Sequence, residues 1–264
     1  MRYPKGSEER EISFSFPSKK WIVEGILSAA MWLNFLLKIT TFNYCNCLSG
    51  GSLRDACQSQ AFCYFCIQNR HTLNYLAHIY LSGTDSQVKI GNFIGDFVKG
   101  SQLDAHLPRI RKGIALHRQI DSFTDSHPLV RETVVLLRPA FGRYSAIIAD
   151  MYFDYFLAAS FPDYSGKRLN TFAYRFYFDL LLYYRHLPPR VKRFVFHFIS
   201  TNRLYQYSTL EGLKSSLEIM SNHKVPAINP DKTIDFLIEN HDELEKRFHQ
   251  FFPDLVQFVK KEII

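Results

Sequence analysis

The sequence predicts an all-α protein: a single multi-helix bundle that follows a poorly structured N-terminal extension. From about residue 74 onward, apolar side chains recur at the three- and four-residue intervals of helices. Strict alternation of apolar and polar residues, the pattern of half-buried strands, is scarce. All five cysteines and both tryptophans of the 264 residues precede residue 67. This break in composition indicates a domain boundary near residue 72, with a helical domain over residues 73–264.

The extension, residues 1–72, has no pattern that defines a fold. Its segment WIVEGILSAAMWLNFLL resembles a signal peptide or a marginal membrane segment, but polar residues interrupt it and no convincing cleavage site follows. The pairs Cys45/Cys47 and Cys63/Cys66 could bind zinc, although their spacing is irregular and no histidine stands at finger spacing. We favour a disordered extension or a mistranslated leader.

Each later segment carries its own helical signals. Residues 86–100 place their large apolar side chains roughly on one side. Residues 127–142 start with Pro128 in a first-turn position and are expected to end at Pro139 and Gly142. Residues 143–161 are apolar around most of the circumference, so we expect this helix at the centre of the domain.

The C-terminal third continues the helical pattern. Residues 168–187 end before a double proline, and residues 190–207 read as the next helix. Residues 209–223 follow, and a final amphipathic helix is expected from about residue 231 to 261. Pro253 should break or kink that last helix.

The segment GIALHRQIDSFTDSHP, residues 113–128, places His117, Asp121 and Asp125 at intervals of four. Because each helical residue turns about 100° from the last, these three side chains follow one another in steps of about 40° along one flank. Aspartate is a poor interior residue for a helix, and two aspartates four apart repel each other. A bound cation is the simplest feature that would offset the repulsion.

The same spacing recurs in three other segments: Asn74 with His78, Asn92 with Asp96, and Asp150 with Asp154. The last pair stands on the most apolar helix. A carboxylate there must be neutral with a raised pKa, paired with a base, or bound to a metal. Four helices that each present Asp, His or Asn can enclose a metal inside a bundle.

Simpler interpretations of the individual residues stay open. Asp125 could cap the next helix, and Asn74 could cap the first one. Asp96 could be an ordinary exposed residue, and His78 could be a core histidine. Arg118 could neutralise a nearby carboxylate, or it could hold a phosphate oxygen.

The candidate ligands are mostly oxygens with one or two imidazoles. This set suits Mn²⁺, Mg²⁺ or Fe better than zinc, which favours thiolates. Such a site lowers the pKa of water and polarises a phosphoryl oxygen. Hydrolysis of a phosphate ester is therefore the leading chemistry, and an HD-like hydrolase of nucleotides or other small phosphodiesters is one form of it.

Four segments, NYLAHIYLSG, GNFIGDFVKG, LHRQIDSFTDSHPLV and DMYFDYFLA, resemble the acyl carrier protein phosphodiesterase family in order and approximate spacing, and ELEKRFHQFFPDL resembles its C-terminal stretch. The resemblance covers about residues 74–264. It implies an all-helical fold distantly related to the HD phosphohydrolases. It also implies a manganese-dependent hydrolase that removes 4′-phosphopantetheine from a serine of holo acyl carrier protein.

By match to the family motifs, the expected catalytic residues include His78, Asp96, His117 and Asp121. A hydrolytic mechanism adds Arg118, to neutralise the phosphoryl oxygens, and suggests His78 or His117 as a proton donor. The expected metal ligands are His78, Asp96, His117, Asp121, Asp125, Asp150 and Asp154.

Two features depart from the family pattern. Leu73 stands where family chains generally begin with Met, so a Leu codon could serve as an alternative start. HD phosphohydrolases carry an adjacent His-Asp pair, whereas His117 and Asp121 are separated by three residues. We interpret the literal pair His241-Asp242 as a surface coincidence.

The net charge of +7 favours an acidic partner. Acyl carrier proteins are small and acidic, and two basic clusters could steer them: Arg109, Arg111 and Lys112, and Arg190, Lys192 and Arg193. We expect no nucleic-acid partner, because no recognition motif is present. We also expect no membrane span within residues 73–264, and a cytoplasmic location. A non-enzymatic helical protein that binds acyl carrier protein is the alternative of another class.

Overall fold

The computed structural model describes residues 75–222 and 228–263, all within the unit Arg54–Ile264. Every regular element of these residues is a helix, which confirms the all-α prediction. The predicted extension of residues 1–72 with its cysteines, as well as Leu73 and Asn74, lies outside the described residues. None of the helices described is both long and apolar enough to cross a bilayer.

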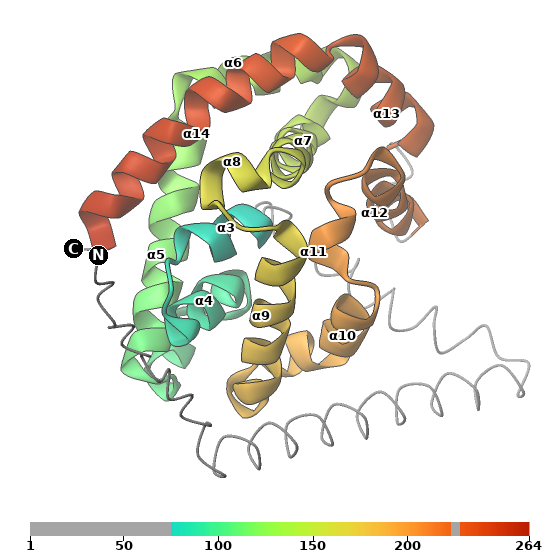
Figure 1. The fold of residues 1–264 in the computed structure, drawn as a ribbon. Coiled ribbons are helices and arrows are strands. Elements are labelled where there is room, and N and C mark those ends of the chain that lie inside the picture. Colours follow the sequence, from blue (N-terminus) through green and yellow to red (C-terminus); the bar gives the residue numbers. More distant parts are fainter. Residues whose placement is uncertain (1–74, 223–227, 264) are drawn as a thin grey trace, which may run out of the picture. The chain divides into compact units, whose positions relative to one another are not determined.

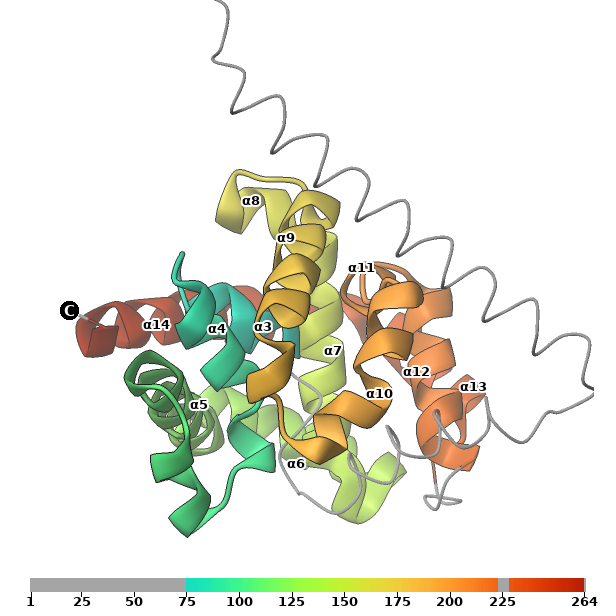
Figure 2. The same cartoon turned by 90° about the horizontal axis from the view of Figure 1, so that it is seen from below.

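The described α-helices follow in this order: α3 (Tyr75–Leu81), α4 (Ser86–Phe93), α5 (Pro108–Ser126), α6 (Pro128–Phe141), α7 (Ser145–Ala159), α8 (Phe161–Ser165), α9 (Leu169–Leu182), α10 (Pro189–Ser200), α11 (Arg203–Gln206), α12 (Leu210–Asn222), α13 (Pro230–Glu239) and α14 (His241–Ile263). Short 3-10 helices join some of them: η1 (Gly95–Phe97), η2 (Gly100–Ala105), η3 (Gly142–Tyr144) and η4 (Tyr184–His186). Figure 1 shows α14 running beside α6, and Figure 2 shows α7 surrounded by other helices.

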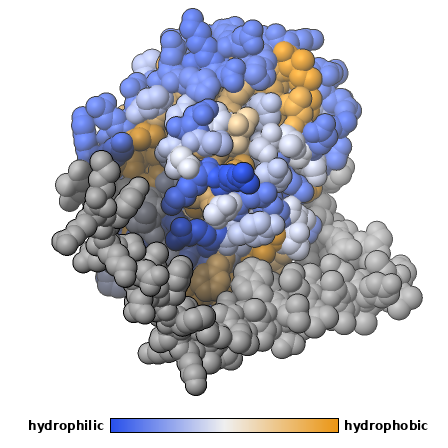
Figure 3. Space-filling model, in the orientation of Figure 1, coloured by the Kyte–Doolittle hydropathy of each residue, from blue (hydrophilic) through white to orange (hydrophobic). Residues whose placement is uncertain are grey.

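Helix α7 is the central helix, as its apolar sequence predicts. It contacts α3, α6, α12 and α14, and most of its side chains are buried. Phe153 stacks on Phe251 of α14, and Phe156 stacks on Phe248 of the same helix. The face shown in Figure 3 is mainly hydrophilic where the residues are described, with apolar side chains exposed in separate patches.

Helices α4 and α5 pack unusually closely because glycines form their contact. A Cβ atom on Gly91 of α4 would collide with the carbonyl oxygen of Ile110 on α5. A Cβ atom on Gly113 of α5 would collide with the carbonyl oxygen of Val88 on α4. The two backbones can approach this closely only where side chains are absent. This crossing sets the distance between Asn92 on α4 and His117 on α5.

Two predicted helix boundaries are wrong, because single asparagines end helices that the apolar pattern carries through. The predicted helix 190–207 is interrupted at Asn202, whose φ of 46° is left-handed. The predicted final helix divides at Asn240, whose amide nitrogen and side-chain nitrogen both donate to the carbonyl of Phe236. Pro253 lies inside α14 without ending it, and Pro139 lies inside α6. The predicted end of α6 at Gly142 is confirmed, because Gly142 is its C-cap residue.

Candidate functional site

One carboxylate faces two imidazoles in the interior of the bundle. Asp121 and His117 stand one turn apart on α5, and His78 comes from α3. Asp121 Oδ1 lies 3.2 Å from His78 Nε2, and Asp121 Oδ2 lies 3.3 Å from His117 Nε2. The two imidazole rings stack with centroids 4.2 Å apart. Both histidines are buried, so these groups meet where water has little access.

Asn92 of α4 fixes the orientation of both imidazoles. Its side-chain nitrogen donates to the carbonyl oxygen of His78 and to Ser82 Oγ, each at 2.9 Å. A carbonyl can only accept, so the Asn92 amide must turn its own oxygen toward the rings. That oxygen lies 2.7 Å from His78 Nδ1 and 3.2 Å from His117 Nδ1. Both Nδ1 atoms therefore carry a proton and donate it to Asn92.

This arrangement leaves the two Nε2 atoms facing carboxylate oxygens. Besides its contact with Asp121, His117 Nε2 lies 3.1 Å from Asp96 Oδ2, and Asp96 comes from η1. In a neutral imidazole with Nδ1 protonated, Nε2 presents a lone pair. Lone pairs and carboxylate oxygens repel at these distances unless positive charge lies between them. The cluster formed by His78, His117, Asp121 and Asp96 therefore needs either protons on the Nε2 atoms or a bound cation.

The electrostatics of His78 agree with this requirement. Burial by itself lowers the pKa of His78, but the hydrogen bond and charge of Asp121 raise it. The charge of Asp96 and the hydrogen bond with Asn92 raise it further, so the pKa of His78 lies above its ordinary value. The carboxylates thus stabilise positive charge at this position, whether a proton or a metal ion supplies it.

The donor set fits a divalent cation. One ligand atom from each of His78, His117 and Asp121 lies within 4.8 Å of the others. The hydrogen bonds from Nδ1 to Asn92 hold both Nε2 atoms toward the carboxylates, as second-layer partners of metal-bound histidines do. Gly95 leaves room for this arrangement, since a Cβ atom there would collide with the ring of His117.

Asp154, an expected ligand, is not part of this three-residue group. Its two carboxylate oxygens accept hydrogen bonds from the backbone nitrogens of Leu76, at 3.1 Å, and Ala77, at 3.2 Å. Asp154 therefore caps the first turn of α3 from α7, and α3 carries His78. Burial raises the pKa of Asp154 to about 7, although both backbone hydrogen bonds lower it.

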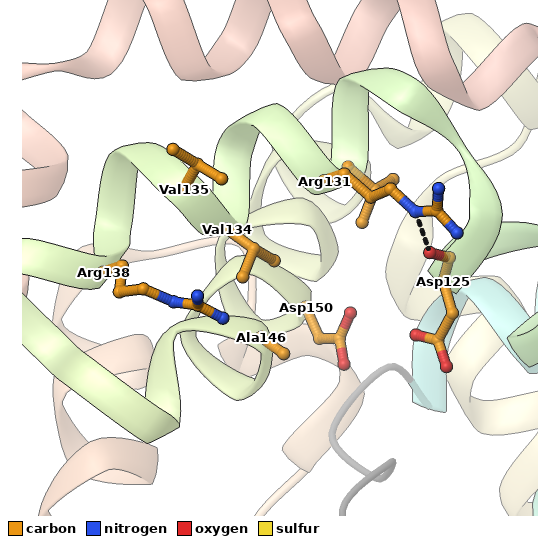
Figure 4. A pocket seen from close by; sticks show the side chains of 8 residues that line it. Asp125, Arg131, Val134, Val135, Arg138, Ala146 and Asp150 are labelled. Atoms are coloured by element: carbon orange, nitrogen blue, oxygen red, sulfur yellow. Dashed lines mark hydrogen bonds between the residues drawn. The ribbon is translucent and has the colours of Figure 1, made fainter.

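Asp125 and Asp150, also expected ligands, line a neighbouring cleft (Figure 4). Asp125 is exposed, and it precedes the N-cap residue of α6, His127, so it does not occupy the N-cap position. Burial, followed by the charges of Asp121 and Asp125, raises the pKa of Asp150 well above its ordinary range.

The remaining predicted positions lie at the surface. Arg118 is exposed, and its Nη2 donates to the carbonyl of Val98 at 3.3 Å. His241 and Asp242 lie at the start of α14, where the Asp242 side chain is fully exposed and His241 Nδ1 is 3.5 Å from it.

The central role of Asn92 was missed by sequence reasoning, which paired it only with Asp96. The signal was its position one turn before an expected ligand.

A helical bundle with an internal histidine–carboxylate centre is the class that the fold and the cluster define. The model of the family described as acyl carrier protein phosphodiesterase matches residues 73–255. The chain belongs to this family.

Individual relatives agree with the family model. The acyl carrier protein phosphodiesterase of Yersinia pestis is 29% identical over 187 residues, which cover 70% of this chain and 96% of the relative. Its counterpart in Escherichia coli O127:H6 is 27% identical over 73% of this chain and 100% of the relative. The Serratia proteamaculans protein is 26% identical over 71% and 98%. No solved structure matches the chain.

Proposed function

We propose that this chain hydrolyses the phosphodiester that joins 4′-phosphopantetheine to a serine of holo acyl carrier protein. The products are apo acyl carrier protein and free 4′-phosphopantetheine. Family membership supports the substrate, and one observation supports the chemistry: both Nε2 atoms of the buried histidines are held toward carboxylates. The alternatives, a nucleotide phosphohydrolase and a non-enzymatic binding protein, are not favoured by the family match.

We assign His78 Nε2, His117 Nε2 and Asp121 as the groups that would hold a divalent cation, with Asp96 beside His117 as a further ligand. Mn²⁺ is our first choice, with Mg²⁺ or Fe as alternatives, because the set combines carboxylates with imidazoles. When bound, such a cation polarises a phosphoryl oxygen and makes water acidic enough to act as a nucleophile near neutral pH.

The chain's own residues orient the imidazole rings and neutralise negative charge on the phosphoryl group. Asn92 fixes the imidazole rings through both Nδ1 protons. Arg118 follows His117 on α5, and its guanidinium is assigned to the phosphoryl oxygens, where a planar cation matches developing charge. The geometry does not favour His78 or His117 as proton donor to the serine oxygen, because their Nδ1 protons are bound to Asn92 and their Nε2 atoms face carboxylates.

The direct test incubates the purified full chain and holo acyl carrier protein with Mn²⁺, with Mg²⁺ and with a chelator, and then weighs the carrier. We expect a mass loss equal to the prosthetic group with a metal ion and none with the chelator. An unchanged carrier mass under all three conditions would rule out the proposed function. If the carrier lost the same mass in the presence of the chelator, the proposed substrate would stand, but the proposed metal site would be ruled out.

A further inference from the structure

The cleft beside the cluster is built from three consecutive helices. It has a volume of about 310 Å³, at the lower end of the range of about 300–1,000 Å³ for small-molecule pockets. Its lining residues are Asp125 of α5, Val130, Arg131, Val134, Val135 and Arg138 of α6, and Ala146 and Asp150 of α7. Figure 4 shows Asp125 and Arg131 at one end, Arg138 at the other, and the carboxylate of Asp150 between them.

The carboxylate end of this cleft adjoins the cluster. Asp125 stands one turn after Asp121 on α5. Asp150 interacts electrostatically with both Asp121 and His78, so it lies within range of the cluster. A substrate whose phosphate sits at the cluster would therefore have the cleft beside the phosphate.

The side chains that line the cleft suit one part of the proposed substrate, the part that carries the prosthetic arm. Four aliphatic side chains line the cleft, and the part of the chain that the structure describes contributes no aromatic ring to it. Among these described lining residues a nucleoside would find no ring to stack on, whereas a narrow chain with methyl groups, amides and a hydroxyl finds apolar walls between polar ends. Carboxylates accept hydrogen bonds from hydroxyl and amide N–H groups, and a guanidinium donates to amide carbonyls.

We propose that this cleft between α5, α6 and α7 binds the pantetheine arm of the substrate, with Val134 and Arg138 as residues that determine specificity. The proposal rests on the proposed function and adds a subsite to it. The prosthetic arm would lie along α6 on one side of the phosphate, and the carrier protein would lie on the opposite side. The chain then distinguishes a phosphopantetheine diester from other diesters by the arm.

The test compares Val134→Phe, which fills the cleft, with Val256→Phe, which enlarges another half-buried valine, on α14 outside the cleft. The probes are holo acyl carrier protein, bis(4-nitrophenyl) phosphate as a small diester without an arm, and free pantetheine in calorimetric titration. For Val134→Phe we expect KM for the holo carrier and Kd for pantetheine to rise at least about tenfold, as for a filled apolar pocket. Hydrolysis of the small diester should stay within about twofold, and Val256→Phe should resemble the wild type in all three measurements.

Arg138→Gln keeps the test decisive if Val134→Phe fails to fold, because Arg138 is exposed. We expect a smaller rise of the same two constants, about threefold, because Arg138 is exposed and water replaces much of the hydrogen bond that is lost. Folded variants that bind pantetheine and process the holo carrier like the wild type would overturn the cleft assignment. If the wild type released no prosthetic group, the proposed function would fail, and the pantetheine titration alone would still decide the cleft.

Discussion

At the scale of single residues, the cluster depends on Asp121, whose two oxygens contact both imidazoles. We expect Asp121→Asn to reduce turnover of the holo carrier at least about a hundredfold, because several kcal/mol of charge stabilisation would be lost. Helical circular dichroism should be retained. The matched control is Asp163→Asn on α8, an exposed aspartate whose replacement should leave turnover unchanged. Wild-type turnover in Asp121→Asn would contradict the assignment.

Asn92 is the second residue whose role can be isolated. Asn92→Ala removes the acceptor shared by both Nδ1 protons, so the rings lose their common orientation. Second-layer partners of this kind are worth about 10- to 100-fold in metal affinity, and we expect that loss in a calorimetric Mn²⁺ titration. Asn240→Ala, which removes a hydrogen bond at the end of α13, is the control. Equal Mn²⁺ affinity in both variants would show that Asn92 does not position the ligands.

At the scale of elements, the α4–α5 crossing positions Asn92 and Asp96 against α5. Alanine normally stabilises a helix by about 1 kcal/mol relative to glycine. At Gly113 the sign should reverse, because the added methyl group collides with Val88, and overpacking costs about 1–3 kcal/mol. We expect Gly113→Ala to lower both the melting temperature and the turnover. Ser122→Ala, on the exposed face of α5, should change neither, and a stabilised Gly113→Ala protein would refute the close crossing.

The cap that Asp154 provides for α3 predicts a dependence of stability on pH. The native pKa of about 7 is raised from 3.8, so the native state binds the proton more tightly than the unfolded state does. The stabilising contribution of this group is therefore complete below pH 3.8 and is lost as pH rises through about 7. In Asp154→Asn this contribution to the dependence of stability on pH should be absent.

Urea unfolding with a chelator present, at several pH values between 5 and 8, measures this effect. The variant should be the less stable protein at pH 5, because an amide cannot accept both backbone hydrogen bonds, and the difference should narrow toward pH 8. Asp242→Asn controls for loss of one exposed charge. A constant difference between variant and wild type across the range would argue against the raised pKa.

At the scale of the whole molecule, the charge of +7 suits an acidic protein partner. Of the two predicted basic clusters, the one on α5 is partly neutralised, since Arg109 pairs with Asp85 and Arg111 lies 3.4 Å from Asp104. On α10, no ion pair joins Arg190 or Arg193 to another residue among those the structure describes. Cations also stand at the unfavourable end of that helix, its N-terminus.

We therefore expect Arg190→Glu/Arg193→Glu to raise KM for the holo carrier about tenfold at low salt and to weaken its salt dependence. Hydrolysis of bis(4-nitrophenyl) phosphate should be unaffected, because that substrate needs no docking surface. Lys260→Glu/Lys261→Glu at the end of α14 makes the same charge change elsewhere. Equal effects of the two double variants would mean that only net charge matters.

The sequence alone determined the helical class and the central place of α7, and it placed His78, His117 and Asp121 among seven expected ligands. The tertiary structure brought these three together, because His78 comes from a different helix. Helical periodicity and four-residue spacing are local properties, so they can be read without a fold. The positions of Asp96 and Asn92 relative to His117 depend on how closely α4 and α5 cross, and glycine contacts between distant segments set that distance. The four-residue spacing of Asp150 and Asp154 suggested a shared role. Only the tertiary structure separated them, because it placed the first turn of α3 against Asp154 and left Asp150 at the cleft.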